Sequence, residues 1–323
     1  MIVTIDKTSE IPLIGLAFIG IITRNDNNII QIRPTTICNM SCTFCSTDGG
    51  PNGKYDKTQF TLDLNYLLDY LKELSIYFNQ ELIAHIDSVG EPTTYPKLLE
   101  LVKGIKEIKN FKEITLVTNG TLLTKEKIDL LEKTGLNKIN LSIHSLDEKK
   151  SKELFGNQRY NVNRTIQLIK DIQKTKIELT LTPVLIPKIN EEGIEDLVKF
   201  SKDQNCKIAI QMYQIHKFGR KVKTKEQNFY KFYEYLKKLE EKHKVKLRYK
   251  YKESNVNKVN PLPIKFKENE KTQLTIKSPG WLPNQMIGVS KNRSVTIVDC
   301  KDKINTSKKY TIIKNEDNIY LAK

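Results

Sequence analysis

Long apolar runs are absent from this 323-residue sequence. A helix that crosses a membrane needs about 18 or more consecutive apolar residues. The apolar stretch from Ile11 to Ile22 is too short for one and lacks a cleavage-site pattern. Internal repeats with a period of roughly 20 to 50 residues are also absent, which excludes solenoids and propellers. We therefore expect a soluble, cytoplasmic protein that has no part in a membrane.

Cysteine is scarce, with five residues in the whole chain, and three of them lie within eight residues, at Cys38, Cys42 and Cys45. This spacing does not resemble a disulfide framework, and clustered thiols in a cytosolic protein indicate a metal site. The other two, Cys206 and Cys300, stand apart in the sequence and are too few to hold a further metal cluster of their own, which needs about three or four thiolates. Cys300 is expected to be a small buried side chain, and a chemical role for its thiol stays open.

Acidic residues are outnumbered by basic ones, and the formal net charge is +16. Residues 217 to 277 hold 19 Lys and Arg against 7 Asp and Glu, an excess of 12 positive charges. A basic stretch of this size is typical of proteins that bind a polyanion such as nucleic acid. The alternative is an ordinary solvated surface in a chain that uses lysine freely.

Short β-branched runs alternate with amphipathic stretches rich in lysine and glutamate. Six runs have the composition of strands: Ile29 to Ile32, Leu82 to Ser88, Ile114 to Thr118, Lys138 to Ile143, Glu178 to Leu185 and Lys207 to Tyr213. Five stretches between them have the periodicity of helices: Thr61 to Phe78, Tyr95 to Ile108, Lys125 to Lys133, Asn161 to Lys174 and Glu191 to Asp203. We predict an α/β fold, a partial (β/α)6 barrel of the TIM type built from parallel strands.

The pattern changes after Tyr213. Asn228 to His243 predicts one long charged helix, Val245 to Tyr251 a basic strand, and Asn260 to Lys271 a linker. From Gln273 onward, four short alternating runs with turn residues between them indicate a small C-terminal β-barrel domain. The predicted domains are residues 1–215 as the partial barrel with an N-terminal extension over 1–28, residues 216–272 as a basic helical and linker region, and residues 273–323 as the small β-barrel.

The three clustered cysteines follow the first predicted strand with C-x3-C-x2-C spacing. Three thiolates bind three irons of a [4Fe-4S] cubane and leave the fourth iron open for a chelating cofactor. A zinc site is the alternative, but zinc knuckles usually have a fourth Cys or His at short range, and none is nearby.

This motif, together with Gly90-Glu91-Pro92 at the end of the second predicted strand, resembles the radical S-adenosylmethionine (SAM) superfamily over about residues 29 to 215. The resemblance implies that SAM chelates the open iron through its amino and carboxylate groups. One electron from the cluster then cleaves SAM to methionine and a 5′-deoxyadenosyl radical, which abstracts hydrogen from a substrate carbon. The cofactors supply this chemistry, while the protein binds them and excludes solvent.

The resemblance also implies cofactor contacts for individual residues. Phe44 matches the aromatic position that lies against the adenine, and Gly90, Glu91 and Pro92 match the motif that meets the ammonium group of SAM. Ser142, at the end of the fourth predicted strand, would bind the ribose or carboxylate.

Three further strand-end positions are similar to cofactor contacts in the family. Val184, Gln211 and Tyr213 match regions near the adenine. Asn119 would line the substrate side. His144 is predicted to be a rim residue, with proton donation or ligand binding as alternatives.

The C-terminal fifty residues loosely resemble a TRAM-type domain, a small barrel that attaches modifying enzymes to RNA. Aromatic side chains for base stacking are Tyr249, Tyr251, Trp281, Tyr310 and Tyr320, interleaved with Lys246, Arg248, Lys250, Lys252 and Lys309. Cross-strand packing of these aromatics is the alternative.

We expect a radical SAM enzyme that modifies RNA, specifically a tRNA nucleoside, and takes its electron from a donor such as ferredoxin or flavodoxin. The same chemistry on a protein, peptide or small metabolite, including a coenzyme or lipid precursor, is the first alternative. The second is a non-catalytic RNA-binding protein with a structural metal. The whole chain also resembles an archaeal family of predicted iron–sulfur oxidoreductases, including Ile11-Pro-Leu-Ile-Gly and Gln31-Ile-Arg33-Pro34 before the cysteines.

Overall fold

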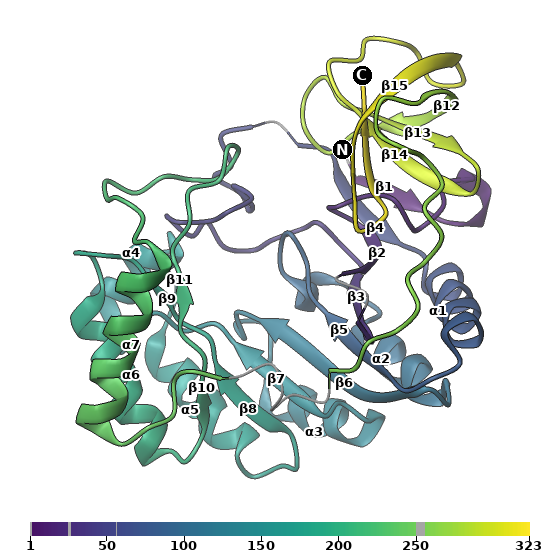
Figure 1. The fold of residues 1–323 in the computed structure, drawn as a ribbon. Coiled ribbons are helices and arrows are strands. Elements are labelled where there is room, and N and C mark those ends of the chain that lie inside the picture. Colours follow the sequence, from purple (N-terminus) through teal and green to yellow (C-terminus); the bar gives the residue numbers. More distant parts are fainter. Residues whose placement is uncertain (1, 25–26, 56, 250–255) are drawn as a thin grey trace. The chain divides into compact units, whose positions relative to one another are not determined.

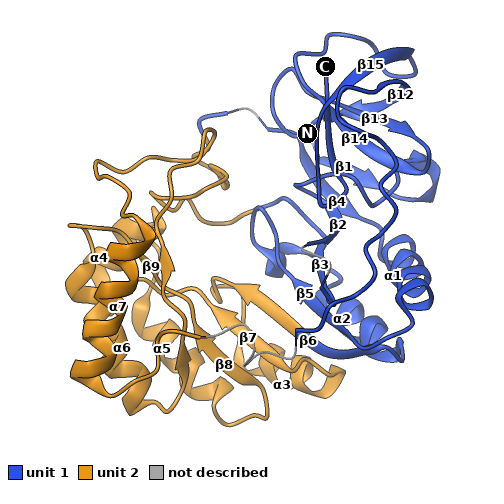
Figure 2. Ribbon diagram, in the orientation of Figure 1, with its two compact units in different colours: residues 1–37, 54–114, 256–323 blue, residues 38–53, 115–255 orange. Residues whose placement is uncertain are grey.

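The computed structural model describes residues 2–24, 27–55, 57–249 and 256–323. By their packing these residues form two compact units, which Figure 2 colours separately. Unit 1 comprises residues 1–37, 54–114 and 256–323, and unit 2 comprises residues 38–53 and 115–255. These units do not test the domain boundaries expected from the sequence, which stay a prediction.

Unit 1 contains two groups of strands besides its C-terminal barrel. The first strand, β1 (Ile2–Ile5), pairs in parallel with β4 (Gln59–Leu62). The second group begins with β2 (Gly20–Thr23), which is antiparallel to β3 (Ile29–Arg33). β3 is parallel to β5 (Leu82–Ile86), as expected for a βαβ unit.

Two helices of unit 1, α1 (Leu64–Phe78) and α2 (Leu98–Glu107), contact each other. α1 begins where the Asp63 side chain accepts a hydrogen bond from the backbone N–H of Tyr66 at 3.0 Å, a regular N-cap. It ends at Asn79, which has a left-handed backbone. Its buried residues recur at helical spacing: Leu67, Leu71, Leu74, Ser75 and Phe78.

Unit 2 carries the remaining strands of the main sheet. β6 (Phe111–Thr118) passes from unit 1 into unit 2, and β7 (Lys138–Leu141), β8 (Glu178–Leu181) and β10 (Lys207–Ile208) follow in parallel. The order of strands is β10-β8-β7-β6-β5-β3-β2 (Figure 1). The predicted α/β fold with parallel strands is therefore confirmed.

The helices of unit 2 are α3 (Lys125–Thr134), α4 (Glu148–Phe155), α5 (Val162–Ile172), α6 (Glu191–Asp203) and α7 (Phe229–His243). α4 was not predicted, because its sequence is mostly charged and only its last turn has an apolar pair. None of the helices within the described ranges has the length and apolar character needed to span a bilayer.

All six strands predicted for the main sheet are present, but the last two are each interrupted. The predicted fifth strand divides into β8 and β9 (Val184–Leu185), and the sixth into β10 and β11 (Gln211–Met212). β9 and β11 form a separate parallel pair. Pro183, which has no N–H to donate, lies at the interruption and accepts a hydrogen bond from the Gln211 N–H at 2.8 Å.

The strand predicted over Val245 to Tyr251 is wrong for its described part, residues 245–249, which form neither a helix nor a strand. The Glu240 carboxylate of α7 instead accepts hydrogen bonds from the backbone N–H groups of Leu247 and Arg248, at 2.7 and 2.8 Å. These donors are therefore not available to a strand partner. Tyr251 lies outside the described residues.

The C-terminal residues form a closed barrel of five strands in the order β12-β13-β14-β16-β15. They are β12 (Lys271–Pro279), β13 (Met286–Ser290), β14 (Arg293–Ile297), β15 (Ser307–Glu316) and β16 (Ile319–Ala322). Its buried core includes Phe266, Leu274, Ile276, Val295, Ile297, Ile312 and Tyr320. The predicted small β-barrel is confirmed, with β13 as the strand that the four sequence runs did not include.

The N-terminal segment packs directly on this barrel within unit 1. The Ser294 N–H donates to the Ile14 carbonyl at 2.9 Å, and the Tyr320 N–H donates to the Gly15 carbonyl at 3.0 Å. Gly15 has φ +131°, and a Cβ there would lie 1.8 Å from the Ser294 carbonyl oxygen. Only glycine allows this approach.

Candidate functional site

The cysteine loop, residues 38–53, belongs to unit 2 and runs without a helix or strand. Its backbone is paired with the end of α4, because the Ser41 N–H donates to the Phe155 carbonyl at 3.1 Å and the Thr43 N–H to the Leu154 carbonyl at 2.9 Å. At Gly156, which follows α4, a Cβ would lie 2.0 Å from the Ser41 carbonyl oxygen. The helix that the sequence did not predict therefore positions the cysteines.

None of the five cysteines, all of which the structure describes, forms a disulfide. Burial raises the pKa of the Cys42 thiol well above its ordinary value, and the negative charges of Cys45 and Cys38 raise it further, while Arg220 lowers it. Three thiolates this close together repel one another, so a positively charged metal group would stabilise them. The Cys45 Sγ already accepts a hydrogen bond from the Gly49 N–H at 3.3 Å.

The donor set fits a cubane. Within the described ranges, no three His, Cys, Asp or Glu side chains converge on the position of a single metal ion. A [4Fe-4S] cluster does not require such convergence, because each thiolate binds a different iron.

Phe44, between the second and third cysteines, lies in an apolar cluster of unit 2. Leu154, Ile186 and Tyr213 form the buried part of this cluster, and Phe44 and Val184 pack against it. The structure thus brings together Phe44, Val184 and Tyr213, three residues predicted from different parts of the sequence to lie near the adenine. The fourth, Gln211, is exposed. Their roles toward the adenine stay predictions.

His144 is not the rim residue that the sequence predicted, since only 3% of it is exposed. Its ring contacts Phe44 edge to face, with centroids 4.8 Å apart. Its Nδ1 accepts a hydrogen bond from the Val184 N–H at 3.1 Å. Burial lowers the pKa of His144 to about 3, so the imidazole is neutral at physiological pH. His144 therefore holds the β9 end of the site rather than donating a proton from a charged ring.

Asn190 is a buried polar residue that the sequence analysis missed. Its side chain accepts from the Ile186 N–H at 2.8 Å and donates to the Val184 carbonyl at 2.9 Å and the His144 carbonyl at 3.3 Å. These hydrogen bonds fix the backbone of the turn between β9 and α6. An asparagine directly before a predicted helix was the available signal.

Gly90-Glu91-Pro92 lies in unit 1, against the residues that directly precede Cys38. A Cβ on Gly90 would lie 2.3 Å from the Ile37 carbonyl oxygen and 2.5 Å from that of Thr36. The Glu91 N–H donates to the same Ile37 carbonyl at 2.8 Å. The buried Glu91 carboxylate also accepts from the Thr93 N–H at 3.0 Å and from its hydroxyl at 2.6 Å.

We expect Gly90→Ala to impair cluster binding, because its Cβ would displace the backbone that leads into Cys38. Iron bound per chain after anaerobic reconstitution should fall to less than about half. Gly193→Ala is the control, since its Cβ would meet only side-chain and carbonyl atoms of residues 144–145 at 3.3 Å or more. Equal iron content in both variants would contradict this role of Gly90.

Asn119 and Asn39 form a polar network beside Cys38, within unit 2. The Asn119 side chain donates to the Asn39 Oδ1 at 3.0 Å and accepts from the Thr121 N–H at 3.0 Å. Asn39 in turn donates to the Thr121 hydroxyl at 2.8 Å. Asn119 therefore holds the start of the cysteine loop, and its place on the substrate side stays a prediction. Ser142 directly follows β7, and its N–H donates to the Thr118 carbonyl at 2.9 Å. Its binding of the SAM ribose or carboxylate stays a prediction.

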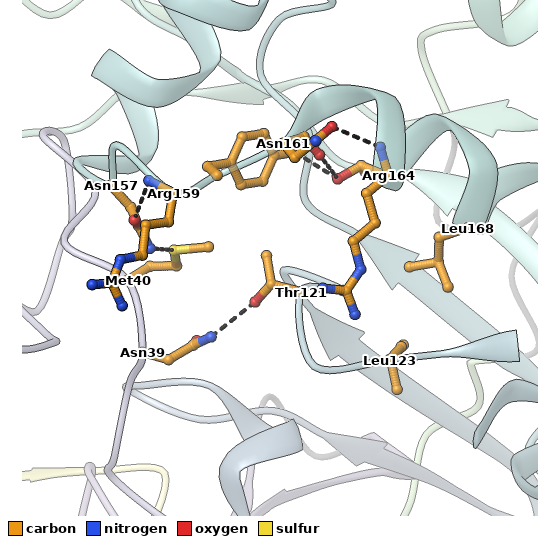
Figure 3. A pocket seen from close by; sticks show the side chains of 12 residues that line it. Asn39, Met40, Thr121, Leu123, Asn157, Arg159, Asn161, Arg164 and Leu168 are labelled. Carbon is orange, nitrogen blue, oxygen red and sulfur yellow. Dashed lines mark hydrogen bonds between the residues drawn. The ribbon is translucent and has the colours of Figure 1, made fainter. Parts of the chain in front are cut away.

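Asn39 and Thr121 of this network also line a pocket of about 160 Å³, which lies within unit 2 (Figure 3). The cysteine loop, the turn after β6 and the start of α5 form its walls. Arg164 extends from α5 toward Thr121 and Leu123, and Arg159 lies beside Met40. Neither arginine has an ion-pair partner among the described residues. A concave site with two such cations suits an anion.

The family model described as "Radical SAM superfamily" matches residues 32–201, more than half of the chain. This chain belongs to the radical SAM superfamily. Radical SAM proteins bind a [4Fe-4S] cluster and SAM, and these are the cofactors of this enzyme. The resemblance first indicated by the cysteine spacing is confirmed.

The proteins to which this radical SAM protein is similar differ in how much of their own length the similarity covers. An uncharacterized protein of Methanocaldococcus jannaschii is 35% identical over 99% of this chain and 80% of its own. A GTP 3′,8-cyclase of Aquifex aeolicus is 28% identical over 54% of this chain and 53% of its own. SuiB of Streptococcus suis, solved with S-adenosylmethionine, shares the fold with a TM-score of 0.55 and 22% identity over 76% of this chain and 52% of its own. The chain spans about half the length of the last two.

Proposed function

We propose that this radical SAM enzyme modifies a nucleoside of RNA, and of tRNA in particular, with its cluster on Cys38, Cys42 and Cys45. When bound, the cluster and SAM supply a 5′-deoxyadenosyl radical that takes a hydrogen atom from the substrate. The apolar cluster around Phe44 and Tyr213 would keep water from this radical. Glu91, by its charge, would bind the ammonium group of SAM.

One observation carries the choice of RNA: an exposed segment that mixes lysines with aromatic rings. We call residues 215–233 the basic aromatic segment. It holds six Lys and Arg against one acidic residue, Glu226. Phe229, Tyr230 and Tyr233 are 62, 75 and 49% exposed, although folding favours burial of such rings. Proteins that bind single-stranded nucleic acid combine stacking rings with cations in this way.

The basic aromatic segment is hydrogen-bonded to the cysteine loop within unit 2. The Arg220 N–H donates to the Cys45 carbonyl at 2.8 Å, and a Cβ on Gly219 would lie 2.8 Å from the same oxygen. A strand of RNA that binds this segment would therefore lie near the cluster. The carboxylates of the described residues form no ion pairs with Lys217, Lys221, Lys223 or Lys225, so these lysines can bind phosphate.

The C-terminal barrel contributes less to stacking than its sequence predicted. Tyr310 and Tyr320 belong to the barrel core, and Trp281 stacks on Phe18 with centroids 5.7 Å apart. Tyr310 and Tyr320 are buried, so their predicted contact with bases is wrong, whereas Trp281 is partly exposed and its contact with bases stays a prediction. Tyr249, which lies outside the barrel in unit 2, is 45% exposed, and the Lys246 ammonium lies over its ring. We propose that the TRAM-like barrel contributes phosphate contacts through its exposed lysines.

A free nucleotide is the second candidate substrate, and two observations favour it. One is the similarity to a GTP 3′,8-cyclase, whose name states that it acts on GTP. The other is the pocket that Arg159 and Arg164 line beside the cysteine loop, because paired arginines suit phosphate. A protein or peptide substrate has only a similarity of fold in its favour, to SuiB bound to the precursor peptide SuiA.

The substrate class is tested by anaerobic reconstitution, reduction with dithionite in the presence of SAM, and chromatography for 5′-deoxyadenosine. The three reactions contain bulk tRNA, GTP or no addition. We expect product formation to rise with tRNA. If 5′-deoxyadenosine rises with GTP alone, RNA is not the substrate and a free nucleotide is. If its amount is the same in all three reactions, the substrate is a peptide or another metabolite.

We expect the double variant Phe229→Ala, Tyr230→Ala to bind tRNA about tenfold or more weakly, because each stacked base contributes roughly 1 to 3 kcal/mol. Fluorescence anisotropy at low salt measures the dissociation constant. Ile76→Ala is the control, since Ile76 is 78% exposed on α1. Equal losses in both proteins would contradict a stacking role for the basic aromatic segment.

A further inference from the structure

The side chain of Arg220 is fully occupied by the cysteine loop, although it lies more than 170 residues away in the sequence. Its Nη1 donates to the Cys42 carbonyl at 3.0 Å and its Nη2 to the Gly49 carbonyl at 2.8 Å. Its Nε lies 2.9 Å from the Asp48 Oδ1. The guanidinium group thus spans the loop from its second cysteine to a point beyond its third.

Asp48 and Arg220 form a buried ion pair, with 2% and 16% of their side chains exposed. Asp48 has a φ of +52°, a backbone conformation that is uncommon outside glycine and that Asp tolerates better than most residues. A buried ion pair is costly to form unless its hydrogen bonds are well made. Here Nη1 and Nη2 of the same guanidinium are bonded to loop carbonyls, which satisfies the arginine side of the pair.

We propose that Arg220 is a positioning residue that holds the cysteine loop in its cluster-binding conformation and sets the reduction potential of the cluster. This role rests on the radical SAM assignment and does not depend on RNA as the substrate. Arg220 belongs to neither the cysteine motif nor the Gly-Glu-Pro motif.

The effect on the loop follows from the hydrogen bonds. Groups that fix the ligands of a metal site from outside typically change metal affinity about 10- to 100-fold when they are removed. Lysine at position 220 would keep the charge but could not span the Cys42 and Gly49 carbonyls together with the Asp48 carboxylate, because it lacks the planar fork of arginine.

The effect on the potential follows from the charge. A cluster gains one negative charge on reduction, and net charge near a cluster is one of the factors that set its potential. The guanidinium lies against the ligand loop, with its Nη1 3.0 Å from the Cys42 carbonyl oxygen. It therefore favours the reduced cluster, while the Asp48 carboxylate opposes it. The two residues should shift the potential in opposite directions when each is neutralised.

Three variants separate the two effects: Arg220→Gln, Arg220→Lys and Asp48→Asn. Lys170→Gln is the control, because Lys170 is an exposed cation on α5 in the same unit and forms no hydrogen bond or ion pair with the described residues of the loop. Each protein is reconstituted anaerobically without SAM or RNA. The midpoint potential is measured by a redox titration followed by electron paramagnetic resonance, and the rate of iron loss is measured with a chelator.

We expect the Arg220→Gln midpoint to shift negative, the Asp48→Asn midpoint to shift positive and the Arg220→Lys midpoint to stay near that of the unmodified protein. Iron loss should be about tenfold faster in both Arg220 variants. If the Arg220→Gln and Asp48→Asn midpoints move in the same direction, the electrostatic role is wrong. If both Arg220 variants lose iron as slowly as Lys170→Gln, the positioning role is wrong. Should Arg220→Gln fail to fold, an Asp48→Asn midpoint that does not shift positive contradicts the electrostatic role, and iron loss from Arg220→Lys as slow as from Lys170→Gln contradicts the positioning role.

Discussion

Cys42→Ala should yield a colourless protein that forms no 5′-deoxyadenosine. Two thiolates retain a cubane poorly. Iron and sulfide analysis after reconstitution, followed by chromatography of the SAM cleavage reaction, measures both losses. We expect bound iron to fall about tenfold or more.

Cys206→Ala is the matched control for this experiment. Cys206 is a half-buried thiol in the same unit, directly before β10, and it is not part of the cysteine loop. It should reconstitute to the level of the unmodified protein. A Cys42→Ala protein with a stoichiometric cluster and full SAM cleavage would overturn the assignment of the cluster to this loop.

Glu91→Gln should keep the cluster and weaken the binding of SAM by about 10- to 100-fold. The glutamine Oε1 can still accept the hydrogen bonds from Thr93, so the local turn is retained. The change removes only the negative charge that would meet the ammonium group, and hydrogen bonds to charged groups contribute roughly 1.5 to 3 kcal/mol. Equilibrium dialysis of SAM against the cluster-loaded protein measures the affinity.

Glu100→Gln, on the exposed face of α2, controls for the loss of one carboxylate from unit 1. If SAM binds to Glu91→Gln and Glu100→Gln with the same affinity, Glu91 does not contact the cofactor. Together with the cysteine variants, this pair separates failure to hold the cluster from failure to hold SAM.

The alternative of a non-catalytic RNA-binding protein loses support from the family assignment. Membership in the radical SAM superfamily provides the cluster and SAM, and the Gly-Glu-Pro motif is packed against the approach to Cys38. The choice between RNA and a nucleotide depends on two different features of unit 2, the basic aromatic segment and the arginine pocket (Figure 3). The dissociation constants of tRNA and GTP for the unmodified protein and for the Phe229→Ala, Tyr230→Ala variant would therefore distinguish them, because only RNA binding depends on the basic aromatic segment.

Much of the fold and of the cluster site could be predicted from the sequence alone, because the patterns that indicate them are local. The spacing of Cys38, Cys42 and Cys45 indicated the cluster, and alternating apolar runs indicated the six strands, the parallel sheet and the C-terminal barrel. These patterns depend on residues within one turn or one strand of each other. Hydrophobic periodicity also placed α7, whose first residue lies one position after the predicted start.

Tertiary structure decided which of these residues meet and which side chains remain exposed. The contact of Arg220 with the Cys42 carbonyl joins residues 178 positions apart, and no local pattern records such a pair. The charged sequence of α4 showed too little periodicity to predict the helix that holds the cysteine loop. Tyr310 and Tyr320 are buried while Phe229 and Tyr230 are exposed, although all four are aromatic. Burial depends on the closure of the barrel and on the packing of whole elements, so it emerges only when distant parts of the chain come together.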